Sequence, residues 1–382
     1  MKKNILFAFL FCGITGSVFS QTNHSATDPN FFPISVWYQS VANAQAYKDN
    51  GINLYVLPLE LNESSINQLK SVGMKCIINQ NATALSHLND SIIYGWHIGV
   101  DEPDNAQEDG KGGYLPCIDP AIIIKTYIQL KAKDPSRPVY LNLGVGVADL
   151  GWFGRGDCCN NLDTYRATSN GYVNAGDILS FDVYPVNGGS ESHRNKLWYV
   201  AKGIDSLKSW SLNKKPVWTW IETTKISDSS VGTPTANDIK AEVWMALIHG
   251  AKGIGYFCHS FGHYEAGLLF ADANILSSVK TLNKQITALA PVLNSSSTKG
   301  YATVSSSDGA VPIDIMTKKY GGKNYLFAVT MRPGDTVGTF HVTSGKTVEV
   351  IGENREIPIV NGTFTDSFSS YAVHLYKEKT LR

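Results

Sequence analysis

The sequence lacks the features that mark several common classes of protein. Lysine and arginine together number 33, as do aspartate and glutamate, so no excess charge points to a nucleic-acid or anionic-membrane partner. Charged residues make up 17% of the chain and apolar residues 43%, which is not the composition of a disordered protein. Beyond the first segment, no apolar run is long enough to span a bilayer. The 382 residues therefore predict a folded protein with one large and one small domain, or two of medium size.

The N-terminal segment has the pattern of a secretory signal peptide. Two lysines precede an apolar run, which ends in small residues at Ser17–Ser20. We expect residues 1–20 to be removed by cleavage after Ser20. Cys12 does not fit a lipoprotein site, because the bulky Phe11 precedes it. The protein is expected to be exported, to the periplasm or the extracellular space.

The cysteines are few and follow no zinc-binding spacing, so no metal site is expected. Five would remain in the mature chain: Cys76, Cys117, Cys158, Cys159 and Cys258. An exported protein can form disulfides. Cys117 is expected on a loop that neighbours the loop carrying Cys158 and Cys159, so a bridge to one of these is one hypothesis. Five reduced cysteines are the alternative, and both stay open.

Short apolar runs alternate with amphipathic stretches over most of the chain. The expected strands are Phe32–Tyr38, Ile52–Glu60, Lys75–Asn81, Tyr94–Glu102, Pro138–Gly146, Asp177–Val186, Pro216–Glu222 and Lys252–Ser260. Eight strands alternating with helices over roughly 250 residues predict a (β/α)8 TIM barrel, in the α/β class. A doubly wound open sheet is the alternative, but no glycine-rich phosphate loop follows any strand.

The C-terminal part of the chain has a different pattern. After the polar linker Asn294–Gly300, short alternating strands are separated by turn signals such as Gly321-Gly322 and Asn361-Gly362. This pattern predicts a small antiparallel β-sandwich. The expected domains are therefore the signal peptide at 1–20, the barrel at 21–295 and the β-sandwich at 300–382.

The segment GWHIGVDEPD carries the clearest chemical signal. An apolar strand ends in two adjacent acids, Asp101 and Glu102, followed by Pro103. In a TIM barrel, catalytic groups lie at the C-terminal ends of the strands. Cleavage of a glycosidic bond needs two carboxyl groups beside one sugar ring: one protonates the leaving oxygen, and the other attacks the anomeric carbon or activates water. Glu102, with Asp101 and aromatic residues as neighbours, suits the proton donor, because such surroundings raise the pKa of a carboxyl group.

The segments WHIGVDEP and VWTWIET resemble the ends of strands four and seven in retaining glycoside hydrolases. These belong to the large clan of barrel enzymes (clan A) that includes β-galactosidases and cellulase-like enzymes. The resemblance covers the barrel and implies Glu102 as the acid/base, Glu222 as the nucleophile, an oligo- or polysaccharide substrate and no cofactor. The clan usually has Asn before the acid/base, where this chain has Asp101, so the contact with the substrate's 2-position is expected to differ.

Further polar and aromatic residues are expected at the strand ends and could bind substrate. They are Asp101, Asn142, Asp182, Tyr184, Trp220, Tyr256 and His259. Trp220 alternates with Glu222 and should therefore share its side of the strand, where a sugar ring could stack on the indole. The long loop Gly151–Tyr172 has no helical periodicity and is expected to shape the cleft.

Two other hypotheses remain at this stage. A catalytically inactive barrel that binds carbohydrate would keep the aromatic residues and tolerate the loss of either Glu. A hydrolase could also use Asp101 or Asp182 as its second acid in place of Glu222.

Overall fold

The computed structural model describes residues 28–59, 61–152, 162–188 and 190–379. The predicted signal peptide lies outside this range, so export stays a prediction. Cys158 and Cys159 also lie outside it, but Cys117 is a free cysteine in the structure, which contradicts the hypothesis that it forms a bridge. In the part of the chain that the structure describes, no helix has both the length and the apolar character needed to cross a membrane.

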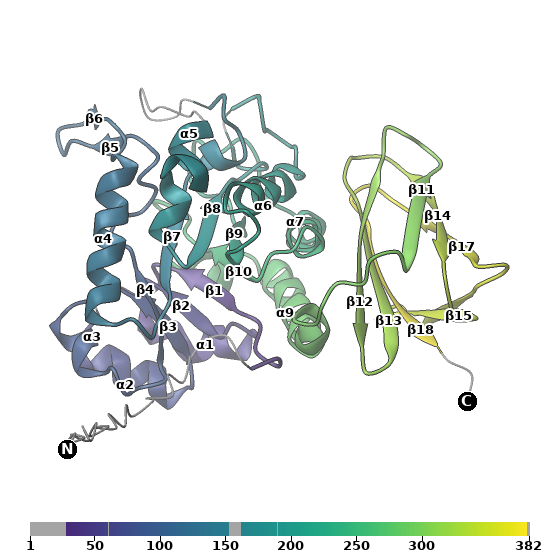
Figure 1. The fold of residues 1–382 in the computed structure, drawn as a ribbon, viewed down its shortest axis with the longest axis horizontal. Helices are drawn as coiled ribbons and strands as arrows, with labels where there is room; N and C mark the ends of the chain where they lie inside the picture. Colours follow the sequence, from purple (N-terminus) through teal and green to yellow (C-terminus); the bar gives the residue numbers. More distant parts are fainter. Residues whose placement is uncertain (1–27, 60, 153–161, 189, 380–382) are drawn as a thin grey trace, which may run out of the picture.

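Eight parallel strands form a closed barrel, which confirms the predicted fold class (Figure 1). The order around the barrel is the order along the chain, since each strand pairs with the next barrel strand and the last pairs with the first. The open-sheet alternative is therefore excluded. The barrel strands are β1 (Ile34–Trp37), β2 (Leu54–Val56), β3 (Lys75–Ile78), β4 (Ile93–His97), β7 (Val139–Leu143), β8 (Ile178–Asp182), β9 (Val217–Glu222) and β10 (Gly253–Phe257).

Large side chains fill the interior of the barrel. Trp218 and Trp220 of β9 pack there with Tyr140 of β7 and with aliphatic residues. Gly253 and Gly255 of the neighbouring strand leave room for the two indoles. A Cβ atom on Gly255 would lie 2.1 Å from the Trp220 ring, so a larger residue there would displace the indole. This packing sets which side of β10 faces inward.

Helices surround the barrel and follow the predicted rhythm. Thr235 and Asp238 form the predicted capping box at the start of α7. Asp119 caps α4, with Pro120 in its first turn as expected. The helices are η1 (Val41–Asn43), α1 (Ala44–Asp49), α2 (Glu63–Ser71), α3 (Ala82–Ser86), α4 (Pro120–Lys133), η2 (Val145–Val147), α5 (Leu162–Tyr165), η3 (Ala167–Ser169), η4 (Tyr172–Ala175), α6 (Tyr199–Trp210), α7 (Ala236–Ile248), α8 (Gly267–Phe270) and α9 (Ala273–Leu293).

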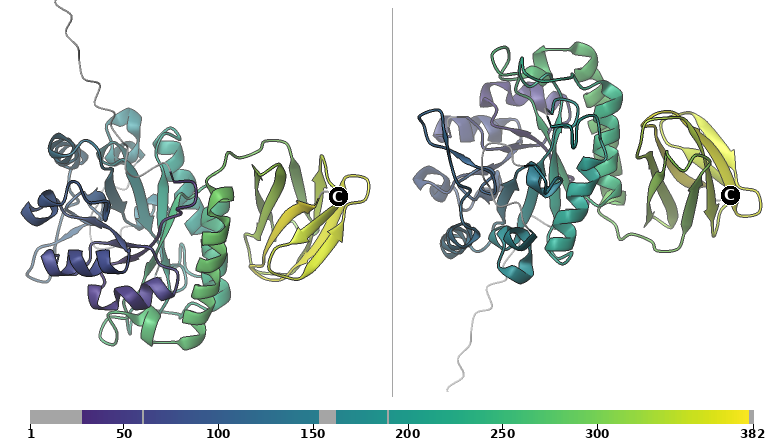
Figure 2. Two further views of the ribbon diagram at one scale, coloured as in Figure 1. Left: turned by 90° about the horizontal axis from the view of Figure 1, so that it is seen from below. Right: turned by 90° about the horizontal axis from the view of Figure 1, so that it is seen from above.

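The C-terminal part forms two antiparallel sheets with a common core (Figure 2). One sheet has the order β11-β14-β17 and the other β12-β13-β18-β15-β16. The strands are β11 (Ala302–Ser306), β12 (Ile313–Tyr320), β13 (Lys323–Thr330), β14 (Thr336–Val342), β15 (Thr347–Val350), β16 (Arg355–Pro358), β17 (Thr363–Phe368) and β18 (Val373–Lys379). A further hairpin, β5 (Gln107–Glu108) with β6 (Tyr114–Leu115), lies in the loop after β4.

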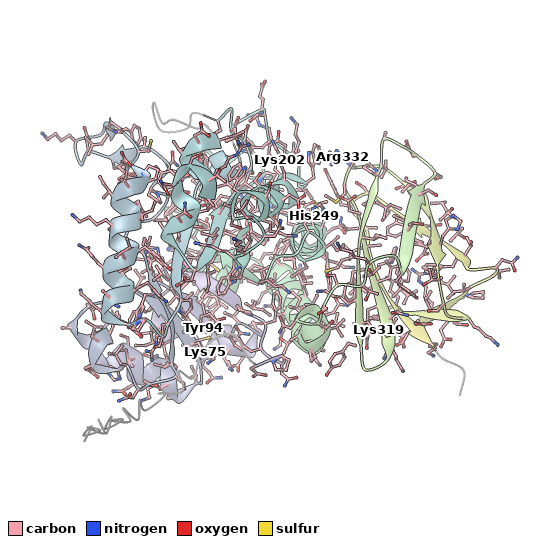
Figure 3. All side chains as sticks on the ribbon, in the orientation of Figure 1. Lys75, Tyr94, Lys202, His249, Lys319 and Arg332 are labelled. Carbon is pink, nitrogen blue, oxygen red and sulfur yellow. The ribbon has the colours of Figure 1, made fainter. Side chains whose placement is uncertain are left out.

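The β-sandwich packs against α7 and α9 (Figures 1 and 2). The rings of Trp244 in α7 and Phe327 in β13 have centroids 5.3 Å apart. His249, labelled in Figure 3, lies 2.8 Å from a carboxylate oxygen of Asp205 in the barrel and 3.0 Å from one of Asp314 in the sandwich. Burial lowers the pKa of His249, but its hydrogen bonds to the two carboxylates outweigh this effect and raise the pKa to about 9. An ionic contact therefore joins the two domains.

Candidate active site

A cleft of about 600 Å³ opens at the C-terminal ends of the barrel strands. It is lined by Trp37, Val100, Asp101, Glu102, Ala106, Gln107, Glu108, Asn142, Asp182, Tyr184, Trp220, Ile226, Phe257 and Phe261. Six of the residues predicted from sequence meet here: Asp101, Glu102, Asn142, Asp182, Tyr184 and Trp220. Glu222, Tyr256 and His259 do not line the cleft.

A second cavity of similar size lies at the opposite, N-terminal end of the barrel. Lys75 and Tyr94, labelled in Figure 3, line it together with Lys252, Asp177 and several prolines. It lacks a cluster of carboxyl groups like the one in the first cleft. The cleft at the C-terminal ends is therefore the candidate site, because TIM barrels carry their chemistry there.

Glu102 and Asp182 form the acidic centre of the cleft, although they come from the ends of different strands. Burial raises the pKa of Asp182 well above its usual value, and the charges of Glu102 and Asp101 and a hydrogen bond with Glu102 add to the effect. Two carboxyl groups in such contact cannot both ionise without strong repulsion, so one holds a proton. The shifted group is Asp182, which is the more buried of the two.

Asn142 joins the acids to the barrel interior. Its Nδ2 donates to Asp101 at 3.0 Å and to Asp182 at 3.1 Å. Its Oδ1 accepts from the Ser180 hydroxyl at 2.6 Å. Ser180 lies 2.5 Å from the Tyr140 hydroxyl, which accepts from Trp220 Nε1 at 3.0 Å. This chain of hydrogen bonds fixes the orientation of the Asn142 amide, with its donor toward the acids.

The backbone at Glu102 adopts a rare conformation. Its φ angle is +43°, in the left-handed region that non-glycine residues seldom occupy. Asn105 Nδ2 donates to Glu102 Oε2 at 2.9 Å, and Gln107 Nε2 donates to the Glu102 carbonyl at 3.1 Å. Backbone strain of this kind is concentrated at functional sites. The surrounding loop therefore holds Glu102 in a strained but defined position.

Asp104, the last residue of GWHIGVDEPD, is buried and stabilises the loop after β4. Its carboxylate accepts from Gly144 N and from the Tyr165 hydroxyl, both at 2.9 Å. Burial raises the pKa of Asp104 to about 7. The Asp104 side chain thus joins the loop after β4 to the segment after β7, which fixes the loop that carries Glu102.

Aromatic rings form the floor and one wall of the cleft. The rings of Trp37 and Trp220 meet edge to face with centroids 5.2 Å apart. Tyr184 and Phe257 have centroids 5.2 Å apart, and Phe257 and Phe261 have centroids 6.1 Å apart. The cleft therefore presents carboxyl groups opposite apolar rings, an arrangement suited to a ligand with both polar groups and apolar faces.

The structure does not bring Glu222 into this group. Its side chain is fully buried. Oε1 accepts from Val186 N at 2.7 Å, and Oε2 accepts from Asn187 N at 2.8 Å and from Asn187 Nδ2 at 2.6 Å. Burial raises the pKa of Glu222 to about 7, although these donors oppose the shift. Glu222 thus holds the loop after β8 and does not line the cleft.

Glu242 of α7 is the second member of this buried pair. Burial raises its pKa well above the usual value, and the charge of Glu222 adds to the effect. Neither oxygen of Glu242 has a hydrogen-bond partner among the described residues. The pair therefore holds a proton in the helix layer behind β9.

Tyr256 and His259 also lie away from the cleft lining. The Tyr256 hydroxyl donates to Asn283 Oδ1 of α9 at 2.7 Å, so its ring faces the helix layer. His259 packs beside Phe257 and Phe261, and its Nδ1 lies 3.3 Å from Gln39 Nε2. His259 thus supports the aromatic wall from behind.

Sequence reasoning missed several residues of the cleft. Gln107, Glu108, Phe257 and Phe261 line it, and Asn105 contacts Glu102. Phe257 could have been found from the inward-facing glycines Gly253 and Gly255, because alternation places residue 257 on the same side. The loop after β7 contains α5, η3 and η4, which were not expected. Within the described residues, no group of three or more His, Cys, Asp or Glu side chains could hold a metal ion.

No model of a known protein family matches the sequence, and no curated protein matches it. Solved structures share its fold. AmyP in complex with maltose has a TM-score of 0.55 at 9% identity, covering 93% of this chain and 97% of that chain. An α-amylase from Lactobacillus plantarum has a TM-score of 0.51 at 11% identity, covering 92% and 99%. The α-amylase from Geobacillus thermoleovorans, complexed with acarbose, has a TM-score of 0.50 at 11% identity, covering 92% and 99%. At these identities the similarity shows the fold alone.

Proposed function

We propose that the protein is a glycoside hydrolase that cleaves oligo- or polysaccharides, with Glu102 and Asp182 as its catalytic pair. The observation that carries this proposal is the contact of these two carboxyl groups in an open cleft with an aromatic wall. Structures with the same fold include a complex with maltose and one with acarbose, which supports a carbohydrate ligand. The predicted signal peptide supports action after export.

Glu102 and Asp182 have different roles in this proposal, because their surroundings differ. Asp182 holds its proton, because burial and the neighbouring charges raise its pKa. It donates this proton to the leaving oxygen while the Glu102 carboxylate attacks the anomeric carbon and forms a glycosyl-enzyme ester. Asp182 then takes a proton from water, and the water oxygen displaces Glu102 from the sugar. Asp101, bonded to the same amide nitrogen of Asn142, contacts the sugar beside the reacting carbon.

The close approach of the two carboxyl groups favours retention of configuration. Retaining enzymes separate their carboxyl groups by roughly 5–5.5 Å and inverting enzymes by about 6.5–9.5 Å. A hydrogen-bonded pair is closer than inverting enzymes require, because they must admit a water molecule between the base and the anomeric carbon. The proposal keeps the retaining mechanism expected from sequence but changes the roles: Asp182 takes the acid/base role expected of Glu102, and Glu102 takes the nucleophile role expected of Glu222.

The test is hydrolysis of a panel of aryl glycosides and oligosaccharides, followed by NMR of the first product formed. Release of sugar that first appears in the substrate's anomeric form supports the proposal. Opposite stereochemistry would contradict the retaining mechanism alone. Tight binding of glycans without any turnover would favour the inactive carbohydrate-binding barrel.

A further inference from the structure

A row of aromatic rings continues from the cleft wall to the rim of the barrel. Phe257 and Phe261 line the cleft. His259 packs against both, with centroids 5.4 and 5.6 Å away. Tyr38, which follows β1, lies beyond His259 with a centroid distance of 6.2 Å and an interplanar angle of 28°. The row thus crosses from the end of β10 to the end of β1, which are neighbouring strands.

The rings at the two ends of the row are exposed to solvent, whereas the ring at its centre is buried. Phe261 is 57% exposed and Tyr38 is 49% exposed, whereas His259 is buried. Single exposed apolar side chains are common and need no explanation. Rings in consecutive contact that lead out of a cleft are different, because they place the exposed rings of Phe261 and Tyr38 along the path of a ligand that extends beyond the cleft.

Hydrogen bonds beneath the row hold it in place. Gln39 Nε2 lies 3.3 Å from His259 Nδ1 and donates to the Glu265 carbonyl at 2.9 Å. The Tyr47 hydroxyl donates to Gln39 Oε1. Phe261 N donates to the carbonyl of Ile226, which also lines the cleft. A preorganised surface of this kind loses little conformational entropy when a ligand binds.

Tyr38 provides a second sign of function. Its φ angle is +48°, a strained conformation for a residue with a side chain. Its half-exposed ring gains little from burial in return. A strained backbone that presents an exposed aromatic ring beside a cleft points to a ligand contact.

We infer that Phe261 and Tyr38 form a binding subsite for a sugar ring of an oligosaccharide chain, beyond the position where the bond is cleaved. The ligand class follows from the chemistry. The C–H faces of a pyranose pack on aromatic rings, while its hydroxyl groups remain in water along the exposed rim. This inference rests on the proposed function and adds to it that the preferred substrate is a chain longer than the cleft alone can hold.

The variants Phe261→Ala and Tyr38→Ala test the subsite, with Phe270→Ala as the matched control. Phe270 is 59% exposed and does not line the cleft. Hydrolysis is measured on gluco-, galacto-, manno- and xylo-oligosaccharides of increasing length. Melting temperatures are recorded for each variant.

The intact protein should cleave longer chains with higher kcat/KM than disaccharides. Tyr38→Ala should raise KM for the longer chains about tenfold and leave disaccharide cleavage unchanged, since Tyr38 lies outside the cleft lining and its ring binds ground state and transition state alike. Phe261→Ala should raise KM for the longer chains by at least as much and should also weaken disaccharide cleavage, because Phe261 lines the cleft itself. Phe270→Ala should match the intact protein.

Two results would overturn the inference, and they differ in what else they affect. If the intact protein cleaves oligosaccharides but Phe261→Ala and Tyr38→Ala keep its length preference, the subsite fails and the proposed function stands. If the intact protein cleaves no glycan of the panel, the proposed function fails and the subsite fails with it.

Discussion

Two pairs of carboxyl groups lie near the C-terminal end of the barrel, in opposite surroundings. Glu102 and Asp182 face an open cleft and are held mainly by side-chain amides. Glu222 and Glu242 are enclosed, and the oxygens of Glu222 accept three hydrogen bonds from Val186 and Asn187 in the loop after β8. Burial raises a pKa in each pair. A raised pKa at a strand end therefore does not distinguish a catalytic acid from a structural one.

Access to the cleft makes that distinction. A catalytic acid needs an oxygen that can reach a ligand, and the cleft pair has this. The Glu222–Glu242 pair instead fixes two loops that border the cleft. Asn187, bonded to Glu222, also accepts from Ile226 N at 2.8 Å, and the same loop carries Tyr184. We therefore propose that Glu102 and Asp182 react with the substrate, whereas Glu222 holds the loop after β8 in position.

The largest expected effect follows from Glu102→Gln. The amide cannot attack the sugar or serve as a base, so kcat should fall by roughly 10²–10⁴-fold or more while the melting temperature stays unchanged. Glu108→Gln is the matched control, because Glu108 lines the same cleft and is exposed. If Glu102→Gln were as active as Glu108→Gln, Glu102 would not be a catalytic residue.

Glu222→Leu should have its main effect on stability. The substitution leaves three buried N–H groups of Val186 and Asn187 without an acceptor, and each such group costs about 1–3 kcal/mol. We expect the free energy of unfolding to fall by about 3 kcal/mol or more, measured by urea denaturation. Asp182→Asn is the comparison and should leave stability unchanged or raise it. An undiminished stability of Glu222→Leu would contradict the structural role.

The pH dependence of stability should depend on Glu242. The pKa values of Glu222 and Glu242 are raised, the former from 4.5 to about 7. The folded state thus holds protons that the unfolded chain releases above pH 4.5. This contribution is fully present below that pH and is lost as the pH rises through about 7.

Glu242→Gln removes one ionisable group and keeps nearly the same side-chain shape. The variant should therefore lose less stability than the intact protein on the alkaline side. The difference should grow by at most about 1.4 kcal/mol per pH unit. Urea unfolding at mildly acid and mildly alkaline pH measures it. If the free energy of unfolding fell equally with pH in the intact protein and in Glu242→Gln, Glu222 and Glu242 would not titrate in this pH range.

Ser180→Ala should have the smallest effect, on the alignment of the cleft pair. The change leaves Asn142 Oδ1 without the Ser180 donor, so the amide can rotate away from Asp101 and Asp182. We expect kcat to fall about tenfold with little change in KM. A change in stability with no change in kcat would show that the hydrogen-bond chain is structural alone.

The barrel could be predicted because its signal repeats. Eight apolar runs at regular spacing, each followed by an amphipathic stretch, specify the strand order without knowledge of any contact. The strand-end rule then found Glu102, Asn142 and Asp182, since these side chains project directly into the opening. The alternation of side chains along a strand was sufficient to locate a residue wherever its side chain points to the side of the strand that this alternation predicts.

The same rule did not locate Glu222 or Tyr256. Glu222 follows the inward-facing Trp220, but its carboxylate turns toward Val186 and Asn187, which are over thirty residues away in the chain. Tyr256 lies in register with Ile221, whose side chain packs outside the barrel. Both outcomes depend on tertiary contacts that no spacing in the sequence encodes.

The most direct test of this account is to compare the turnover of Asp182→Asn and Glu222→Gln on the same oligosaccharide, per mole of folded protein. Our account predicts that Asp182→Asn loses roughly 10²-fold or more in kcat. Glu222→Gln should stay within about tenfold of the intact protein, because it acts through the loop. Near-complete loss of turnover in Glu222→Gln, with full activity in Asp182→Asn, would contradict it and return the nucleophile to the end of β9.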